Sequence, residues 1–335
     1  MINEAINKLA EKQNLTGAET IGAFGEIMSG EATNAQIAAF ITAMRMKGET
    51  IEEITACAKV LREKCTHIDL GKDVLDIVGT GGDCANTFNI STTSSFVIAA
   101  AGVPVAKHGN RSVSSKSGAA DVLEELGVKI DLSAERNKEL LQEIDLCFLF
   151  AQAYHASMRF AGPVRKELGI RTVFNIIGPL ANPAFASLQL LGVYKKELVE
   201  PLAKVLANLG VKRGIVVYGN DGIDEVTVSS TNTIAEINDG EITTYTLDPQ
   251  AFGFTPCKKS DLMGGDAKIN AGITYDILSG KEQGAKRDAV VLNSGLSLYL
   301  GGKGSIKECI ELARITLDNG KALQKLQQLI VLSNG

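Results

Sequence analysis

The chain has 335 residues, of which 45% are hydrophobic and 22% are charged, and its formal net charge is −5. This length is roughly twice that of a typical domain, so we expect two compact units that share one cleft. The negative balance argues against a protein that binds a long polyanion, because nucleic-acid affinity rests on many Lys and Arg contacts to phosphate. No stretch approaches the ~20 apolar residues that cross a bilayer, so we expect a soluble protein with no membrane partner.

The amino terminus favours a cytoplasmic location. Its first residues, MINEAINKLAEKQ, mix charged and apolar side chains at helical spacing and lack the apolar core of a secretory signal. The six cysteines lie far apart and include no CxxC pair, so neither a zinc site nor a disulfide framework is indicated. We therefore expect reduced thiols.

Helical spacing dominates the chain up to about residue 68. The pattern predicts four consecutive helices, two of them at 34–46 and 51–64, separated by Gly, Thr or Asn. We therefore expect a small α-helical domain over residues 1–70. A further helical run at about 160–185 is interrupted by Gly and Pro, and we expect it to cross back to this domain.

The remaining residues, 71–335, alternate between strand-like and helical segments. Such alternation is typical of an α/β domain with a central, mostly parallel sheet covered by helices. Two further β-like stretches, TNTIAEIN and GEITTYTLD, precede a helical tail at 288–332. The strand-like segments are 74–79, 104–109, 146–151 and 213–219, with an apolar segment at 188–194, and the helical ones are 91–102, 119–127 and 196–210.

A glycine-rich loop, Gly79-Thr80-Gly81-Gly82-Asp83, directly follows the first predicted strand. Backbone N–H groups of such a loop and of the next helix, which starts near Ser91, can converge on an anion. A generic tight turn is the alternative for the loop, and a simple N-cap is the alternative for the polar helix start. The surplus of hydroxyl groups at the helix start, from Thr87 to Ser95, favours a ligand.

A second polar loop follows the next predicted strand. The run from Lys107 to Gly118 carries three cations, four serines and two glycines, which is a composition typical of an anion-binding loop. A solvated flexible loop is the alternative. Because both loops follow strand ends, they can face each other across one crevice, and together they suit a pyrophosphate.

Asp224 and Glu225 form an acidic pair just after the strand-like RGIVVYG. Adjacent carboxylates repel each other unless a cation or solvent neutralises them, and Mg²⁺ is commonly shared between a few carboxylates and substrate phosphates. An exposed acidic turn is the alternative. The histidines at 67, 108 and 155 stand far apart, so no softer transition metal is indicated.

Four motifs in this order and spacing resemble the anthranilate phosphoribosyltransferases along essentially the whole chain. They are GTGGD with TFNIST, KHGNRSVSSKSG leading into ADVLEELG, AQAYHASMRFAGPVRKELGIRTVFNIIGPLANP, and GNDGIDEVTV. The resemblance implies a nucleoside phosphorylase/phosphoribosyltransferase-like fold, with a small α-helical domain joined to a larger α/β domain that binds phosphoribosyl pyrophosphate. It further implies an active site at their hinge and a homodimer that associates through the helical domains.

The resemblance also implies the substrates, the metal and the site residues. Anthranilate would be contacted by Gly79, His108, Asn110, His155 and Arg165, and Mg²⁺, at two ions per monomer, by Ser91, Asp224 and Glu225. Lys107, Asp224 and Glu225 would act electrostatically, with no obligatory general base. Phosphoribosyl pyrophosphate would be bound by Gly79, Gly82, Asp83, Thr87, Asn89, Ile90, Ser91, Thr92, Lys107, His108, Gly109, Asn110, Arg111, Ser112, Val113, Ser114 and Ser115, with Ala119 contributing only its backbone.

The implied reaction joins the amine of anthranilate to ribose C1 and releases pyrophosphate, a step of tryptophan biosynthesis. One departure from the family pattern is Ala119, where many members carry serine, so one phosphate hydrogen bond is in doubt. Two alternatives stay open. The first is a pyrimidine nucleoside phosphorylase-like enzyme, and the second is a non-catalytic relative that binds nucleic acid, which the charge balance disfavours.

Overall fold

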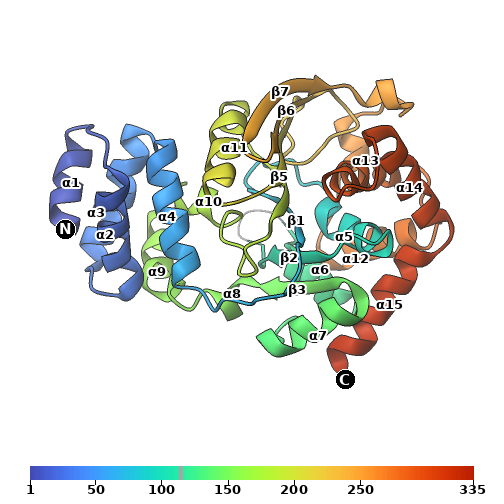
Figure 1. Ribbon diagram of the computed structural model, residues 1–335, viewed down its shortest axis with the longest axis horizontal. Coiled ribbons are helices and arrows are strands. Elements are labelled where there is room, and N and C mark those ends of the chain that lie inside the picture. The colour runs from blue at the N-terminus through green and yellow to red at the C-terminus, as the bar shows by residue number, and fades with distance from the viewer. Residues whose placement is uncertain (113–115) are drawn as a thin grey trace.

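The computed structural model describes residues 1–112 and 116–335, and its elements form two groups that lie side by side (Figure 1). The first group contains the four amino-terminal helices, drawn in blue. They are α1 (Ile2–Ala10), α2 (Gly17–Ser29), α3 (Asn34–Lys47) and α4 (Ile51–Glu63). The helices predicted at 34–46 and 51–64 are thereby confirmed to within one residue at each end.

Three of these helices begin in the same way. Thr16, Thr33 and Thr50 precede α2, α3 and α4, and each threonine hydroxyl accepts a hydrogen bond from the backbone N–H three residues later. That later residue is Glu or Gln, and its side chain accepts a bond from the backbone N–H of the threonine. These capping boxes satisfy N–H groups that a helix start otherwise leaves without partners, which is why the sequence marks these starts so clearly.

The second group is built on a sheet that, in the described ranges, has seven strands in the order β3-β2-β1-β4-β5-β6-β7. β1 to β5 are parallel, whereas β6 and β7 pair antiparallel at one edge. The predicted α/β class with a mostly parallel sheet is confirmed. The strands are β1 (Leu75–Gly79), β2 (Val105–Gly109), β3 (Leu146–Phe150), β4 (Leu188–Gly192), β5 (Arg213–Gly219), β6 (Asn232–Asn238) and β7 (Glu241–Leu247).

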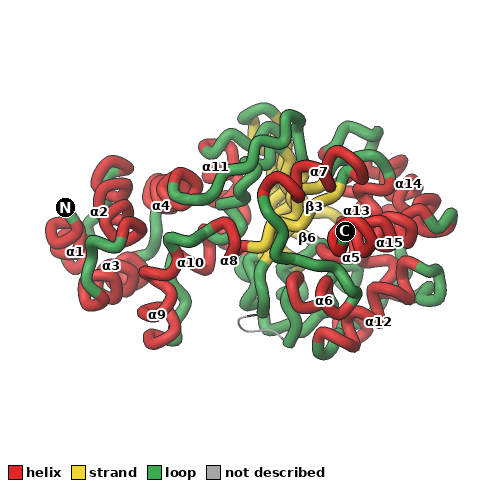
Figure 2. The backbone as a smooth tube through the Cα atoms, turned by 90° about the horizontal axis from the view of Figure 1, so that it is seen from below, coloured by secondary structure: helices red, strands yellow, loops and turns green. Residues whose placement is uncertain are grey.

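Helices cover both faces of the sheet, whose strands are yellow in Figure 2. α5 (Ile90–Ala100), α13 (Ala285–Leu300), α14 (Ile306–Asp318) and α15 (Lys321–Asn334) pack together on one face. α11 (Val199–Asn208) packs against β5 and β6 on the other face. Ile215 and Val217 belong to the first core and Val216 to the second, as expected from the alternation of side chains along a strand.

The second core continues from the sheet into the helical group. α11 packs against α4, α9 (Met158–Leu168) packs against α2 and α3, and α10 (Phe174–Ile177) packs against α4. Residues of these helices share one buried apolar cluster with α1 to α4. The division of the chain at residue 70, with a segment at 160–185 that crosses back, stays a prediction.

Four helices complete the second group. They are α6 (Ala119–Glu125), α7 (Ala134–Ile144), α8 (Ala151–Tyr154) and α12 (Ala267–Leu278). Short 3₁₀ turns cover Lys196–Leu198, Pro249–Phe252 and Lys259–Leu262. α7 and α12 lie outside the predicted elements, and the predicted tail is three helices that begin at Ala285. Over the described part of the chain, no helix has both the length and the apolar character that spanning a bilayer requires.

Candidate active site

Neighbouring parallel strands end together beside the loops predicted to bind phosphate. Gly79 ends β1 and pairs in register with Gly192, the last residue of β4. Gly109 ends β2 and pairs with Phe150, the last residue of β3. Because these are carboxyl ends of adjacent parallel strands, the loops that leave β1 and β2 emerge at one edge of the sheet, where α/β proteins bind ligands.

The loop after β1 is held by its neighbours and by unusual backbone conformations. The Thr80 N–H donates to the Gly192 carbonyl at 2.9 Å, and the Thr80 hydroxyl accepts from the Tyr194 N–H at 3.2 Å. Positive φ angles occur at Gly81, Gly82, Cys84 and Asn86. Such conformations are uncommon for residues other than glycine, so this loop has a specific shape that its surroundings maintain.

The loop leads into α5, whose first turn has no side-chain cap. Asn89 occupies the N-cap position, but its side chain makes no capping hydrogen bond. The Thr92 hydroxyl is buried and has no partner among the residues that the structure describes. An uncapped helix start offers backbone N–H groups and a positive dipole end to an anion. The simple N-cap is therefore not what forms here, and a phosphate ligand fits the free groups.

Ile90 and Thr87 differ from the other members of this predicted set. Ile90 is fully buried, and its N–H donates to the Phe88 carbonyl at 2.8 Å, so its side chain cannot line a ligand site. Thr87 forms an antiparallel bridge with Met263, which brings a distant part of the chain against the loop.

Asp224 lies directly against the glycine loop. Its Oδ2 accepts from the Gly81 N–H at 2.5 Å, and its own N–H donates to Asp83 Oδ2 at 3.3 Å. A Cβ placed on Gly79 would lie 2.5 Å from Asp224 Oδ2, and one on Gly192 would lie 1.6 Å from the Asp224 carbonyl oxygen. Only glycine at both strand ends permits this approach. Asp224 is buried, so the alternative of an exposed acidic turn does not describe it.

Three carboxylates therefore meet at this point. Burial raises the pKa of Asp224 well above its usual value, and the charges of Asp83 and Glu225 raise it further. The pKa of Glu225 is raised to about 7 by desolvation and by Asp83, while Lys107 and Ser91 act in the opposite direction. Burial and mutual repulsion disfavour the ionised form of these carboxylates, so a cation bound among them would stabilise that form.

This donor set fits Mg²⁺ that arrives with a phosphate ligand. Within the described ranges, no three His, Cys, Asp or Glu side chains are arranged to hold a metal by themselves. Mg²⁺ does not need such a cage, because it keeps several waters and is usually bound through one or two carboxylates plus substrate phosphates. Ser91, Asp224 and Glu225, the predicted ligands, are close to one another, as the effect of Ser91 on the Glu225 pKa indicates.

Lys107 supplies a buried cation between the two loops. Its Nζ donates to the Ile77 carbonyl at 2.5 Å and to Ser91 Oγ at 3.3 Å. Burial lowers its pKa, and the nearby carboxylates of Asp76 and Glu225 oppose that shift. Asp76 is fully buried on β1, and burial raises its pKa to about 6. Sequence reasoning missed Asp76, although a lone Asp inside an apolar strand was a signal.

The second loop is closed by a residue that sequence reasoning also missed. Asp121 Oδ2 accepts from the N–H groups of Ser112 at 2.9 Å and Gly118 at 2.8 Å. The guanidinium of Arg111 pairs with Asp121 and with Glu124 on α6. In this structure Arg111 therefore faces α6 carboxylates.

Three further predicted members of this loop, Val113, Ser114 and Ser115, lie outside the described residues. Ala119 begins α6, and its Cβ would be 3.1 Å from a Cβ added to Gly109. Ala119 thus lies against the end of β2, next to the predicted phosphate residues.

Two histidines predicted to contact anthranilate lie together. His108, on β2, and His155, after α8, have ring centroids 5.1 Å apart. Burial lowers both pKa values, that of His155 to about 4, so both imidazoles are neutral near pH 7. Within the described part of the chain, no hydrogen bond of good geometry reaches His108 Nε2 or the His155 ring nitrogens, although the Ala181 backbone opposes the lowering of the His155 pKa. Buried polar atoms are normally satisfied, so His108 Nε2 in particular fits a ligand or water.

Asn110 and Arg165, the other two side chains predicted to contact anthranilate, lie on different elements. Asn110 is exposed, and its Oδ1 accepts from Gln152 Nε2 on α8 at 3.3 Å. Arg165 lies on α9, with its guanidinium 4.8 Å from the centre of the Phe174 ring. Among the described residues, no hydrogen bond or ion pair joins the Arg165 side chain to another predicted site residue. The described members of the predicted set therefore lie around this edge of the sheet, except Arg165, which lies on α9 of the helical side.

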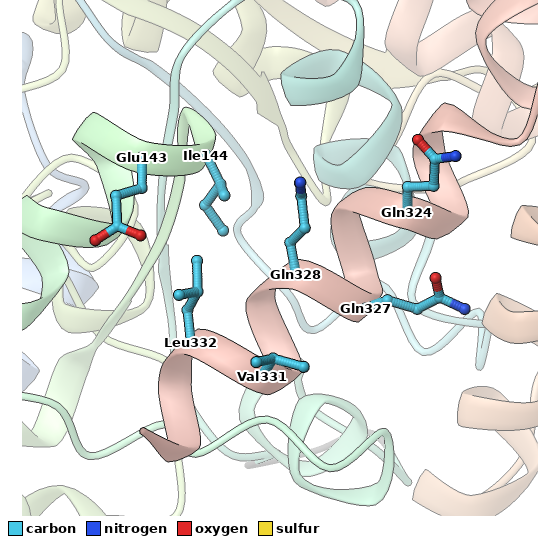
Figure 3. A pocket seen from close by; sticks show the side chains of 7 residues that line it. All are labelled: Glu143, Ile144, Gln324, Gln327, Gln328, Val331 and Leu332. Atoms are coloured by element: carbon cyan, nitrogen blue, oxygen red, sulfur yellow. The ribbon is translucent and has the colours of Figure 1, made fainter.

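A surface cavity elsewhere on the protein lacks the phosphate-binding groups found at the carboxyl edge of the sheet. It has a volume of about 560 Å³ and lies between α7 and α15, where Ile144 and Leu332 point toward each other (Figure 3). Ile144 precedes the amino end of β3, so the cavity lies away from the carboxyl ends of the strands. Its lining includes no cation, and it does not suit a pyrophosphate.

Known proteins resemble this chain over its whole length. Residues 3–65 match the glycosyl transferase family, helical bundle domain, and residues 71–323 match the glycosyl transferase family, a/b domain. The chain is 60% identical over 335 residues to anthranilate phosphoribosyltransferase from Ruminiclostridium cellulolyticum, covering 100% of this chain and 98% of that protein. It is 54% identical to the protein of that name from Methanobrevibacter smithii, with 100% of both chains covered.

Solved structures agree with these relatives. Anthranilate phosphoribosyltransferase from Thermus thermophilus has a TM-score of 0.94 at 39% identity, with 99% of each chain covered. The Saccharomyces cerevisiae protein, solved in complex with PRPP (phosphoribosyl pyrophosphate) and Mg, has a TM-score of 0.91 at 29% identity, with 99% of this chain and 98% of that chain covered. The chain therefore belongs to the anthranilate phosphoribosyltransferase family.

Proposed function

We propose that this protein transfers the 5-phosphoribosyl group from phosphoribosyl pyrophosphate to the amine of anthranilate. The products are pyrophosphate and N-(5-phosphoribosyl)anthranilate, and the reaction belongs to tryptophan biosynthesis. The observation that carries this proposal is the uncapped start of α5 beside Lys107 and three clustered carboxylates. This arrangement is suited to a pyrophosphate with its metal, and the yeast relative was solved with PRPP and Mg.

The donor would lie between the two loops. The N–H groups of the glycine loop and of the α5 start, together with Lys107, would bind its phosphates. Ser91, Asp224 and Glu225 would hold Mg²⁺, at two ions per monomer, and bound Mg²⁺ would neutralise charge on the leaving pyrophosphate. The protein's own contribution is then to hold the donor in place with hydrogen-bond donors that are already oriented.

The acceptor would lie near the paired histidines. Arg165 is suited to the carboxylate of anthranilate, because a guanidinium binds a carboxylate through two parallel hydrogen bonds. Gly79, Asn110, His108 and His155 would complete its surroundings. The neutral state of both imidazoles favours contact with an uncharged aromatic ring.

No strong general base is needed in this reaction. An aromatic amine is already unprotonated at neutral pH, so it can attack ribose C1 directly. The ribose passes through an oxocarbenium-like state, as glycosyl carbons generally do. Negative charge then develops on pyrophosphate, and Lys107 with the loop N–H groups would stabilise it electrostatically.

The cellular setting is part of the same proposal. The protein would act in the cytoplasm as a homodimer associated through its helical domains, with the domain boundary near residue 70. The exposed side chains of Met46 and Ile21 on the helical group are consistent with a covered surface there.

The first experiment is to follow anthranilate fluorescence on mixing the protein with phosphoribosyl pyrophosphate, with and without Mg²⁺. We expect loss of fluorescence that requires both. Parallel reactions with uridine or thymidine plus phosphate test the phosphorylase alternative. Nucleoside cleavage without anthranilate consumption would overturn the proposal.

A further inference from the structure

A distant segment of the chain lies against the phosphate loop. The Phe88 N–H donates to the Leu262 carbonyl at 3.2 Å, and the Gly264 N–H donates to the Asn86 carbonyl at 2.9 Å. Thr87 and Met263 pair between these two bonds. The segment before α12 therefore runs antiparallel to the last residues before α5, although the strands β2 to β7 separate them in sequence.

Asn270, one turn into α12, is held in a single orientation. It is 1% exposed, and its Oδ1 accepts from the Gly265 N–H at 2.8 Å. A Cβ on Gly264 would lie 2.4 Å from that same oxygen and 2.7 Å from the Phe88 Cα, so the packing around the amide is tight. With its oxygen fixed on Gly265, the Asn270 amide can only present its Nδ2 to α5.

That Nδ2 donates to Asn89 Oδ1 at 2.9 Å. Asn89 Oδ1 also accepts from Ser117 Oγ at 3.3 Å, and Asn89 Nδ2 donates to the Ser117 carbonyl at 3.3 Å. Both ends of the Asn89 amide are therefore used. Asn89 joins α12 to Ser117, at the end of the loop that follows β2.

This use of Asn89 explains the uncapped start of α5. Asn is among the residues that most strongly favour the N-cap position, where its side chain accepts from N–H groups of the first turn. Here the side-chain oxygen is engaged by Asn270 and Ser117 instead, so it does not occupy the N–H groups of the first turn, of which that of Ser91 bonds the Glu225 carboxylate.

We propose that Asn270 is a positioning residue for the phosphoribosyl donor. It holds Asn89 in the orientation that ties together both phosphate loops and keeps Asn89 from capping α5. Without it, only the two 3.3 Å bonds to Ser117 hold the Asn89 side chain, which can then turn onto its own helix and occupy N–H groups that the donor requires. This inference rests on the proposed function, and it assigns Asn270 an effect on donor affinity alone.

The test compares Asn270→Ala and Asn270→Asp with Thr274→Val. Thr274 lies one turn later on α12, and its hydroxyl meets that of Thr93 on α5 at 2.8 Å, so both positions join the same two helices. Only Asn270 reaches Asn89. Asn270→Asp keeps the side-chain shape but places a carboxylate oxygen opposite Asn89 Oδ1, which removes the donated bond while preserving volume.

Donor affinity is measured directly by calorimetric titration with phosphoribosyl pyrophosphate and Mg²⁺, and thermal melting checks that each variant is folded. Both Asn270 variants should weaken donor binding about tenfold, as expected for losing a buried hydrogen bond whose partner is then redirected. The KM for anthranilate and kcat at saturating donor should change less than about twofold, and Thr274→Val should leave donor affinity unchanged even where it lowers Tm.

Four outcomes are decisive. Unchanged donor affinity in folded Asn270→Asp overturns the inference, and so does an equal loss in Thr274→Val, which would mean that any loosening of α12 suffices. If the unaltered protein binds the donor but does not consume anthranilate, the proposed function fails while the titrations still decide the role of Asn270. If it does not bind the donor at all, both are overturned.

Discussion

The donor side and the acceptor side of the site are built differently. On the donor side, hydrogen bonds within the protein fix the loops: Asp224 to Gly81, Asp121 to Ser112 and Gly118, and Asn89 to Ser117. On the acceptor side, His108 Nε2 has no hydrogen-bond partner among the described residues, and no hydrogen bond or ion pair in the described ranges joins Arg165 to the predicted set.

This contrast indicates where binding energy is used. A glycine loop that is already held in shape binds its ligand without first being ordered, so little conformational entropy is lost there. An acceptor site with unsatisfied polar atoms gains hydrogen bonds only when its ligand or water is present. We therefore expect substitutions on the donor side to disturb the protein itself, and substitutions on the acceptor side to disturb mainly anthranilate binding.

The largest effect is expected from removing the acidic pair. Asp224→Asn with Glu225→Gln removes two of the three clustered carboxylates, so activity should fall on the order of a thousandfold, in the range found when charge stabilisation is lost at other active sites. The Mg²⁺ concentration needed for half-maximal rate should rise. Rates measured across a Mg²⁺ series check this, and an unchanged Mg²⁺ requirement would remove both residues from the metal role.

Gly192→Ala is expected to have the next largest effect. Its Cβ would lie 1.6 Å from the Asp224 carbonyl, so the acidic loop must move. A shift near 1 Å can reduce activity about a hundredfold, and the KM for phosphoribosyl pyrophosphate should rise with it. Gly25→Ala on α2 is the matched control, because a Cβ there meets nothing within 4 Å. Equal kinetics for both variants would contradict the close approach of Asp224.

Arg165→Ala tests the acceptor side. Loss of a charged hydrogen-bond partner should raise the KM for anthranilate about tenfold or more while leaving the affinity for phosphoribosyl pyrophosphate within about twofold. Arg165→Lys should recover little, since an ammonium cannot make the two parallel bonds. An unaltered KM for anthranilate in Arg165→Ala would remove this residue from the acceptor site.

The sequence predicted best those features that depend on local patterns. The capped helices at Thr33 and Thr50, the parallel strands and the two polar loops all carry periodicity or composition that can be read over a few residues. α7 went unpredicted because its residues are mostly polar and it buries only one narrow side, including Leu140 and Leu141.

Long-range contacts could not be read from the sequence in this way. Gly192 matters because β4 lies beside β1, and Asn270 matters because α12 contacts the start of α5, yet neither pairing leaves a local signal. The sequence identified Asn89 as a polar residue at a helix start. Its side chain, however, bonds Ser117 and Asn270, which are distant in sequence. The fold class could therefore be predicted from the sequence, whereas the long-range contacts that position the site residues could not.

The smallest effect is expected in a protection experiment, which tests the donor side and the acceptor side separately in the unaltered protein. Cys84 is the exposed thiol in the glycine loop, next to Asp83, whereas Cys65 and Cys257 are half-buried and the thiols of Cys57, Cys147 and Cys309 are buried. Phosphoribosyl pyrophosphate with Mg²⁺ should slow alkylation of Cys84 by about threefold to tenfold, because a ligand bound on the glycine loop shields this exposed thiol and restricts its motion. Anthranilate alone should leave the rate unchanged. Mass spectrometry of the peptide that contains Cys84 measures this, with the peptide of Cys257 as internal reference, and protection by anthranilate alone would show that the two sides are not separate.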